Sequence, residues 1–298
     1  MDTVNGIFLL DKPAGLSSNG ALQRVRRLLR ARKAGHVGSL DPLATGMLPI
    51  CLGEATKVAG DMLSGRKLYR FDLQLGSRTT TGDVEGEELE SAPVPALSAA
   101  VIERTLQHFT GAQQQVPPMY SALKRDGQPL YRLARAGIQV ERAPRNIEIY
   151  VLKLRGEPDN PLKLEVLCSK GTYVRTLGED LALALGTVGH LVQLRRASVE
   201  PFSEDAMQSL EELERQLSAG RSAQLLPADT GLQHLPAVQL DAAQARRLLH
   251  GQSVAVDSAT ACGRVRLYGP QHTFLGMGES DLQHRVHPRR LFAAADVP

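Results

Sequence analysis

The chain has 298 residues, 42% of them hydrophobic, and a formal net charge of only +3. This size supports a substantial core and two domains, and the small net charge means that any attraction to nucleic acid must be local. No apolar run approaches a membrane span, no secretory signal is evident, and three widely separated cysteines do not form a disulfide framework, so we expect a reducing cytoplasm.

The first predicted elements form a basic surface. Residues 6–11 predict a strand, and Asn19 is expected to cap a helix over 20–31 whose apolar residues recur at helical spacing. Six basic residues crowd the rest of this segment: Arg24, Arg26, Arg27, Arg30, Arg32 and Lys33. Arginines on a helix are usually a solvated face, but no acid interrupts this run, and the surface therefore predicts contact with a polyanion.

The next segment, 35–46, is a glycine-rich loop with one carboxylate, Asp41. It is the only acid between Asp11 and Glu54. The glycines permit backbone conformations that other residues avoid, and Pro42 restrains the position after the acid. An Asp-Pro pair by itself is typical of a turn. A lone carboxylate in a stiff loop beside a basic helix instead favours a general base or a covalent nucleophile.

The middle of the chain alternates between predicted strands and helices. A buried strand over 48–52 leads into a helix from residue 53, and period-two alternation predicts a half-buried strand over 69–75. Residues 77–95 are polar and acidic and are expected to form a surface loop. Two helices follow, at 99–109 and 130–136.

Further strands are predicted at 147–154, 162–168 and 191–199, and helices at 176–185 and 210–217. The segment 168–176 predicts a strand end, a glycine turn and a helix start, which would bring Tyr173 and Arg175 near one another. An arginine in a first helical turn is disfavoured by the helix dipole and is often solvated. A guanidinium placed there would nevertheless be suited to holding a carboxylate ionised and aligned.

The C-terminal part has a different character. Small polar residues and two prolines make 218–236 a candidate linker. Asp241 is then expected to cap a short helix ending at 250–251. Short glycine-containing strands follow at 253–256, 264–268, 273–277 and 289–292, and they predict a small β-barrel of about sixty residues.

Motifs for metals and nucleotide cofactors are missing from the sequence. There is no Cys-x-x-Cys, His-Glu-x-x-His or EF-hand spacing, and neither a Walker loop nor Gly-x-Gly-x-x-Gly occurs. The side chains that remain as candidates for chemistry are one loop aspartate, tyrosines and arginines. We therefore expect chemistry without a metal or cofactor.

Several ordered motifs share a single resemblance. The most specific is His36-x-Gly38-x-Leu40-Asp41-Pro42-x-Ala44-x-Gly46-x-Leu48-Pro49, continued by Gly53-x-Ala55-Thr56-Lys57. The others are Leu10-Asp11-Lys12-Pro13-x-Gly15-x-x-Ser18, Tyr69-Arg70-Phe71, Met119-Tyr120-Ser121-Ala122-Leu123-Lys124, the run from Cys168 to Thr176, and Leu194-Arg195-Arg196. Together they resemble the TruB family, the bacterial tRNA pseudouridine-55 synthases.

The resemblance implies roles for individual residues. Asp41 would be the nucleophile, Arg175 its salt-bridge partner, and Tyr69 the aromatic that stacks on the target base and a candidate proton acceptor. The implied substrate-binding residues are His36, which would contact the T-loop and help displace the uridine, Tyr173 and Leu194 on the uracil pocket, and Lys12 and Pro13 in the N-terminal motif. The course of the Asp41 step stays open among attack on C1′, attack on the base and removal of the 2′ proton.

The implied fold is α+β. A catalytic domain over 1–232, with a mixed β-sheet flanked by helices, would contain an RNA-contacting insertion at about 112–145, and a small PUA-like β-barrel would occupy 235–298. The expected partner is the T-arm of tRNA, bound by a monomer with no obligatory protein partner and no membrane. Two positions depart from the family pattern, Thr80 and Gly20, where acids are usual, and they are expected to affect local loop or RNA contacts.

Two alternatives remain. A non-catalytic tRNA-binding folding chaperone would account for the basic helix and the barrel, but it would leave the Asp41 loop unexplained. A hydrolase acting on sugar or phosphate generally needs a second carboxylate or a metal, for which the sequence has no motif.

Overall fold

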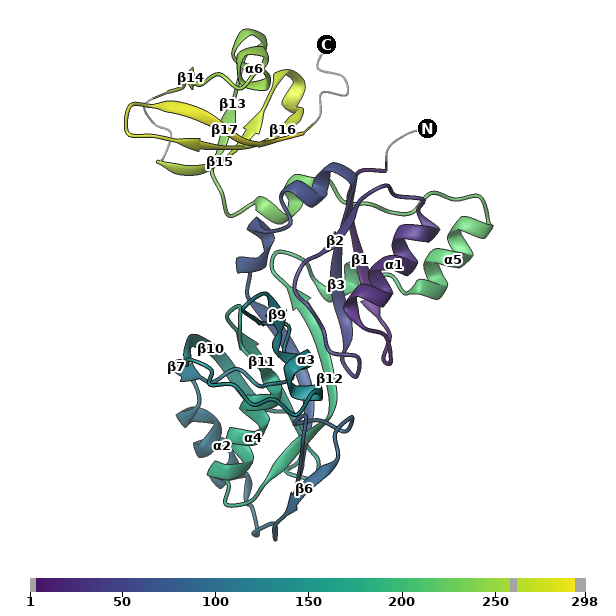
Figure 1. Ribbon diagram of the computed structural model, residues 1–298, viewed down its shortest axis with the longest axis vertical. Coiled ribbons are helices and arrows are strands. Elements are labelled where there is room, and N and C mark those ends of the chain that lie inside the picture. The colour runs from purple at the N-terminus through teal and green to yellow at the C-terminus, as the bar shows by residue number, and fades with distance from the viewer. Residues whose placement is uncertain (1–3, 258–261, 293–298) are drawn as a thin grey trace.

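The computed structural model describes residues 4–257 and 262–292, which form two main β-sheets arranged end to end (Figure 1). The larger sheet has eight strands. Seven follow the order β1-β3-β12-β4-β11-β10-β7, and the eighth, β2, pairs with β3. Its strands are β1 (Gly6–Lys12), β2 (Ala34–His36), β3 (Thr45–Leu52), β4 (Lys67–Leu75), β7 (Gly111–Gln115), β10 (Arg145–Leu154), β11 (Leu162–Cys168) and β12 (Gly189–Val199). The sheet is mixed, because β12 runs parallel to β3 and antiparallel to β4.

The large-sheet domain contains five α-helices within the described residues, of which α3 belongs to the projecting insertion. They are α1 (Ser18–Leu28), α2 (Ala99–His108), α3 (Leu130–Arg135), α4 (Val174–Ala184) and α5 (Leu210–Ser218). Strand β1 is buried on both faces, since Phe8 and Leu10 join the main core while Ile7 and Leu9 join a second one. This double burial explains why β1 reads as a continuous apolar run, whereas β4 alternates. No helix in the described ranges is long and apolar enough to cross a membrane.

Strand β12 joins the two halves of the large sheet. Its Arg196 is paired with Gly46 of β3 and with Tyr69 of β4. A Cβ atom at Gly46 would lie 2.3 Å from the carbonyl oxygen of Arg196, and the Gly46 φ angle is +95°. Glycine is therefore required at this position, where the loop of Asp41 meets the sheet.

The smaller sheet contains the C-terminal strands in the order β13-β15-β16-β17-β14, with α6 (Ala242–Leu249) against it. These strands are β13 (Ala237–Gln239), β14 (Val254–Ala255), β15 (Gly263–Tyr268), β16 (Phe274–Ser280) and β17 (Arg285–Leu291). Asp241 caps α6 as expected, in a full capping box with Gln244. Strand β13 is not among the predicted strands, because its three residues are too few to show a period.

The C-terminal sheet is attached to the rest of the molecule mainly through the segment between β3 and β4. Met277 of β16 belongs to the same buried cluster as Met62 and Val58, and Phe274 packs against it. The Lys57 ammonium donates to the carbonyl of Leu291 at 2.7 Å, and Arg264 forms an ion pair with Asp61. The C-terminal part is thus attached by apolar and polar contacts together.

Three sequence expectations are corrected. Helix α1 is capped by Ser17, not Asn19, because the Ser17 hydroxyl accepts from the Gly20 amide at 3.0 Å. The acidic segment is not only a loop, since β5 (Ser77–Thr79) pairs with β6 (Glu88–Ser91) in a hairpin. The proposed linker is also not a free connection: Leu226 exchanges two 2.8 Å backbone hydrogen bonds with Ile7.

The two positions that depart from the family pattern lie in a turn and at a helix start. Thr80 lies in the turn of the β5–β6 hairpin, where its hydroxyl accepts from the Glu87 amide at 3.1 Å. Gly20 is the third residue of α1, where an acid would complete a capping box with Ser17. Smaller deviations are that residues 53–57 form a 3₁₀ turn and that the main α-helix boundaries differ by up to three residues.

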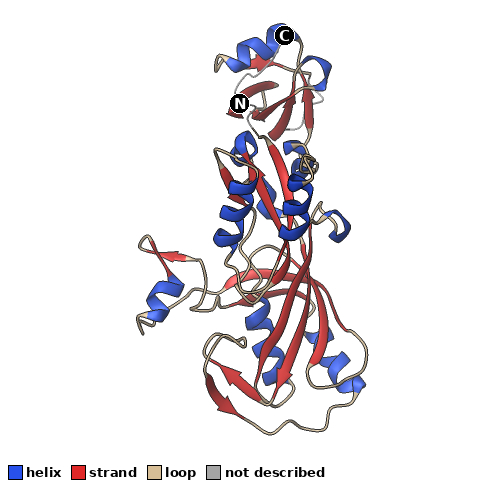
Figure 2. Cartoon of the chain, turned by 90° about the vertical axis from the view of Figure 1, so that its right-hand side faces the viewer, coloured by secondary structure: helices blue, strands red, loops and turns tan. Residues whose placement is uncertain are grey.

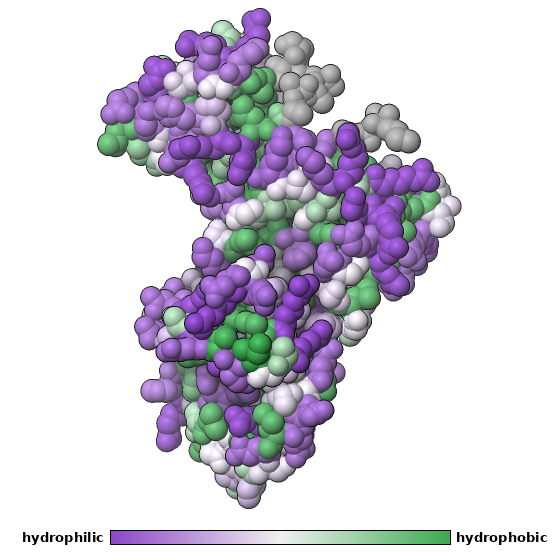
Figure 3. Space-filling model, viewed as in Figure 1, coloured by the Kyte–Doolittle hydropathy of each residue, from purple (hydrophilic) through white to green (hydrophobic). Residues whose placement is uncertain are grey.

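The middle part of the insertion stands away from the large sheet. Between β7 and β10 the chain forms the hairpin β8 (Lys124–Arg125) and β9 (Gln128–Pro129), followed by α3. Figure 2 shows these elements projecting sideways from the body of the molecule. In the space-filling view an apolar patch ringed by hydrophilic residues lies where Figure 1 places α3 and β9 (Figure 3).

Candidate active site

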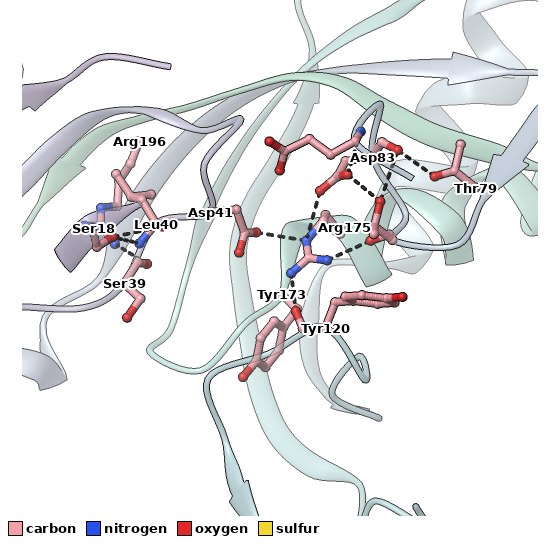
Figure 4. A network of polar contacts seen from close by, with 12 residues as sticks. Ser18, Ser39, Leu40, Asp41, Thr79, Asp83, Tyr120, Tyr173, Arg175 and Arg196 are labelled. Carbon is pink, nitrogen blue, oxygen red and sulfur yellow. Dashed lines mark hydrogen bonds and ion pairs between the residues drawn. The ribbon is translucent and has the colours of Figure 1, made fainter. Parts of the chain in front are cut away.

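Asp41 meets Arg175 as the sequence led us to expect. Asp41 Oδ2 lies 2.9 Å from Arg175 Nε, and the exposed fractions of the two side chains are 38% and 4% (Figure 4). Arg175 is the second residue of α4, where the helix dipole disfavours a cation. The carbonyl oxygens of Thr81 and Tyr120 compensate, each accepting from the guanidinium at 2.7 Å.

A second carboxylate, Asp83, shares the same guanidinium. Asp83 Oδ2 lies 3.7 Å from Arg175 Nε, and its side chain is only 3% exposed. The Thr81 hydroxyl and the Glu85 amide donate to Asp83 Oδ1 at 2.5 and 3.0 Å. These bonds fix a negative charge behind the arginine, so that Arg175 is held between a buried acid and a more accessible one.

Burial and neighbouring charges act together on the ionisation of Asp41. Burial raises the pKa of Asp41 above its ordinary value of 3.8, the Arg175 guanidinium opposes this shift, and the charge of Asp83 reinforces it. The net direction is upward. The ion pair therefore limits the cost of burying the Asp41 carboxylate without fully cancelling it.

The backbone beside Asp41 is fixed from within α1. The Ser18 hydroxyl donates to the Leu40 carbonyl at 2.9 Å and accepts from the Leu40 amide at 2.7 Å. Ser18 is 5% exposed, so water does not compete for these bonds. One buried side chain thus satisfies both polar groups of the residue that precedes Asp41 (Figure 4).

Asp41 and Arg175 line a pocket of about 710 Å³. Its walls include six of the residues expected at the site: Asp41, Arg175, Tyr69, Tyr173, His36 and Leu194. They come from six different elements or loops, yet the fold brings them around one cavity. A volume of this size suits a small ligand or a single nucleoside rather than a stacked strand.

The aromatic residues of the pocket are enclosed. Tyr69 is 9% exposed in β4, and burial raises the pKa of its hydroxyl, as it does for Tyr173. Burial also lowers the pKa of His36, and the charge of Arg196 acts in the same direction. Within the described part of the chain the buried His36 Nδ1 has no hydrogen-bond partner. Burial therefore favours the uncharged forms of Tyr69, Tyr173 and His36.

Three family models together match nearly the whole chain. TruB family pseudouridylate synthase (N terminal domain) matches residues 26–174, tRNA pseudouridylate synthase B C-terminal domain matches 175–233, and Pseudouridine synthase II TruB, C-terminal matches 236–292. The tRNA pseudouridine synthase B of Hydrogenovibrio crunogenus is 51% identical over 290 residues, covering 97% of this chain and 94% of the relative. The chain belongs to the TruB family.

Other relatives and solved structures agree. The tRNA pseudouridine synthase B of Nitrosococcus oceani is 51% identical over 291 residues, covering 97% of this chain and 94% of its own. A Cbf5-Nop10-Gar1 complex gives a TM-score of 0.71 at 23% identity, covering 94% of this chain and 79% of that chain. An H/ACA RNP bound to a substrate RNA gives a TM-score of 0.74 at 21% identity, covering 98% of this chain and 86% of that chain. At such identities the likeness concerns the fold, and it confirms the predicted α+β class with a mixed sheet.

Lys12 does not lie where the resemblance to the TruB family led us to expect it, at the substrate-binding pocket. Neither Lys12 nor Pro13 is among the residues that line the pocket. Lys12 is fully buried, burial lowers its pKa to about 8, and its ammonium donates to the carbonyls of Pro13, Leu16 and Pro42 at 2.8, 2.7 and 3.3 Å. An ammonium has three donors, and all are used inside the protein. We therefore assign Lys12 to support of the Asp41 loop instead of substrate contact.

Two contacts in this TruB site were not expected from sequence. Gln115 at the end of β7 is 5% exposed, and its side chain forms two hydrogen bonds with the backbone of Tyr173, at 2.8 and 3.1 Å. Asp83 holds Arg175 from behind. A buried glutamine or aspartate leaves no periodic signal, so only the fold could reveal these two supports.

The basic residues of and after α1 are exposed, as a role in RNA contact requires. In the folded chain, however, acidic side chains from a distant segment lie near these basic residues. Helix α1 packs against α5, whose first turn contains Glu211 and Glu212, and Glu211 interacts electrostatically with Arg24. The acid-free run of the sequence is thus partly balanced by acids from a distant segment.

Proposed function

We propose that this TruB protein is a tRNA pseudouridine synthase that isomerises uridine 55 of the T-loop, with Asp41 as its nucleophile. The observation that carries the proposal is the Asp41–Arg175 ion pair on the wall of a pocket that also contains two tyrosines. A carboxylate held and aligned by a guanidinium has the accessibility and orientation that a nucleophile needs. The three family models and the similarity to proteins named tRNA pseudouridine synthase B support the reaction class.

The reaction conserves the number of bonds. The N1–C1′ bond breaks, the uracil turns, and a C5–C1′ bond forms while the C5 hydrogen leaves as a proton and N1 gains one. No electron acceptor is consumed. Asp41 acts on the nucleoside, Arg175 keeps the carboxylate aligned, and Tyr69 stacks on the base, while Tyr173 and Leu194 line the remainder of the uracil pocket.

The pocket requires the target uridine to leave its stack. Unstacking costs a few kcal/mol, and stacking on an aromatic ring such as Tyr69 returns about 1–3 kcal/mol per base. His36 lies at the same pocket, and we assign it to contact with the T-loop as the uridine is displaced. Phosphate contacts of the basic surfaces supply further binding free energy, which decreases with salt.

The RNA is proposed to contact three surfaces, namely α1, the insertion at 112–145 and the C-terminal sheet. The insertion has six basic residues and only two acids: Lys124, Arg125, Arg132, Arg135, Arg142 and Arg145 against Asp126 and Glu141. We propose that 1–232 is the catalytic unit and that 235–298 is a PUA-like RNA-binding unit. Within those bounds, 1–3, 258–261 and 293–298 lie outside the described residues. The expected state is a cytoplasmic monomer acting on the tRNA T-arm.

The test is release of tritium from tRNA transcribed with C5-tritiated uridine. We expect about one equivalent of tritium per tRNA, and none from a matched transcript with cytidine at position 55. A folding chaperone would bind both transcripts without release. A hydrolase would instead liberate free uracil or cleave the RNA backbone. Either of these two results would contradict the proposal.

A further inference from the structure

Two consecutive arginines of β12 have opposite environments. Arg195 forms a bidentate pair with Asp11 at 2.9 and 3.0 Å and a third bond with Glu204 at 3.0 Å, and its side chain is 32% exposed. Arg196 is only 1% exposed. No carboxylate in the described part of the chain forms a salt bridge with it; its guanidinium donates to three main-chain carbonyls and also forms a side-chain hydrogen bond with Tyr69.

The carbonyls that Arg196 contacts lie on both sides of Asp41. Nε donates to Met47 at 2.7 Å, and the two terminal nitrogens donate to Gly38 at 3.1 Å and Ser39 at 3.4 Å. Gly38 and Ser39 come before Asp41 in the loop, and Met47 comes after it. One side chain therefore fastens both ends of the loop to the strand that also pairs with Tyr69.

The loop backbone is adapted to this arginine. Gly38 has a φ angle of +73°, and a Cβ atom there would approach an Arg196 nitrogen to 3.3 Å. Gly46 lies against the Arg196 main chain, as described above. Burying a guanidinium without a carboxylate is costly, and hydrogen bonds from every nitrogen are what compensate it. The guanidinium carries its donors on three nitrogens of a rigid plane, so it can span acceptors that lie far apart, whereas all the donors of a lysine share one nitrogen.

We propose that Arg196 is a positioning residue, whose fork holds the 38–47 loop so that Asp41 stays aligned with Arg175 and with the base on Tyr69. The inference rests on the proposed function of Asp41. It does not require Arg196 to contact the RNA. A small misplacement of a reacting group lowers a rate by up to about 100-fold without changing the binding surface. The effect of loosening the loop should therefore fall on turnover and spare affinity.

The experiment compares Arg196→Lys with Arg195→Lys in the full-length chain. Tritium release is measured in single turnover, and tRNA affinity by filter binding. We expect Arg196→Lys to slow the single-turnover rate by about 10- to 100-fold, with a dissociation constant close to that of the wild type. Arg195→Lys, which keeps its charge beside exposed carboxylates, should retain the wild-type rate.

A second variant protects the test from misfolding. Arg196→Gln removes the charge and keeps two side-chain donors, and circular dichroism reports whether each variant is folded. The proposal is overturned if either folded Arg196 variant turns over like the wild type, or if the rate loss is matched by an equal loss of affinity. Absence of release by the wild type would instead reject the proposed function itself.

Discussion

Two networks among the described residues, each with an arginine shared between two carboxylates, have different surroundings: one borders the pocket of Asp41 and the other lies outside it. In the pocket, Arg175 is shared by Asp41 and Asp83, with Arg175 and Asp83 almost fully buried. Outside the pocket a network runs across β1, β12, β4, β11 and β10; its members are Asp11, Arg195, Glu204, Arg70, Glu165 and Lys153. The same chemical groups occur in both clusters, so residue type does not distinguish them.

The surroundings make the difference. Arg70 and Arg195 are about one-third exposed, and each is shared by two carboxylates. Hydrogen bonds from Lys153 and Arg70 lower the pKa of Glu165 even though its burial acts the other way. In the pocket, burial dominates and the pKa of Asp41 is raised. The ion pairs of the outer network stabilise the ionised form of Glu165. In the pocket the ionised form of Asp41 is only partly stabilised, which is common at functional sites.

The largest expected effect is that of Asp41→Asn. Tritium release should fall by at least about 10³-fold, as for loss of a nucleophile, while tRNA affinity stays near the wild-type value. Stability should change little, because the native state disfavours the Asp41 charge and the amide removes it. Normal turnover by purified Asp41→Asn would refute the assignment of the nucleophile.

Arg175→Ala should damage both activity and stability. It leaves Asp83 buried without its cation, which costs about 3–5 kcal/mol in the free energy of unfolding, and turnover should fall by at least about 100-fold. Chemical denaturation and single-turnover release measure the two losses. Asp83→Asn in the same background should recover part of the stability but not the activity. Full activity of Arg175→Ala would mean that the ion pair has no catalytic role.

Acidification should distinguish the pocket from the network. A nucleophilic Asp41 is inactive when protonated, and its pKa is raised above 3.8, so the rate should decline as the pH falls toward this raised pKa, at a higher pH than for an ordinary aspartate. Single-turnover release over the acidic range, at pH values where circular dichroism shows folded protein, gives the midpoint. A midpoint at or below the ordinary value would contradict the influence of burial on Asp41.

The smallest effects are expected in the outer network. Arg70→Ala should lower the free energy of unfolding by only about 0.2–1 kcal/mol for each ion pair lost, because the groups are partly solvated. Turnover should be unchanged. Urea denaturation at low and high salt checks the first expectation, with a smaller difference at high salt. A rate loss comparable to that of Arg175→Ala would erase the contrast between the two clusters.

Much of the local structure follows from the sequence alone. Alternation identified β4, Asp241 identified the cap of α6, and the isolation of Asp41 in a glycine-rich loop marked the segment that proved to face a pocket. Turn and helix signals at 168–176 placed Tyr173 and Arg175 on neighbouring positions. These features depend on short-range geometry, which a few consecutive residues determine.

Only the tertiary structure decided which groups support the site. Asp83, Gln115 and Arg196 lie 42, 74 and 155 positions from Asp41 in the chain, and their buried contacts have no periodic signal. The same is true of Lys12, whose ammonium is enclosed by carbonyls instead of facing the pocket. The physical reason is that burial and the choice of hydrogen-bond partner are set by packing between distant segments, and packing decides whether a charge is solvated, paired or left to act.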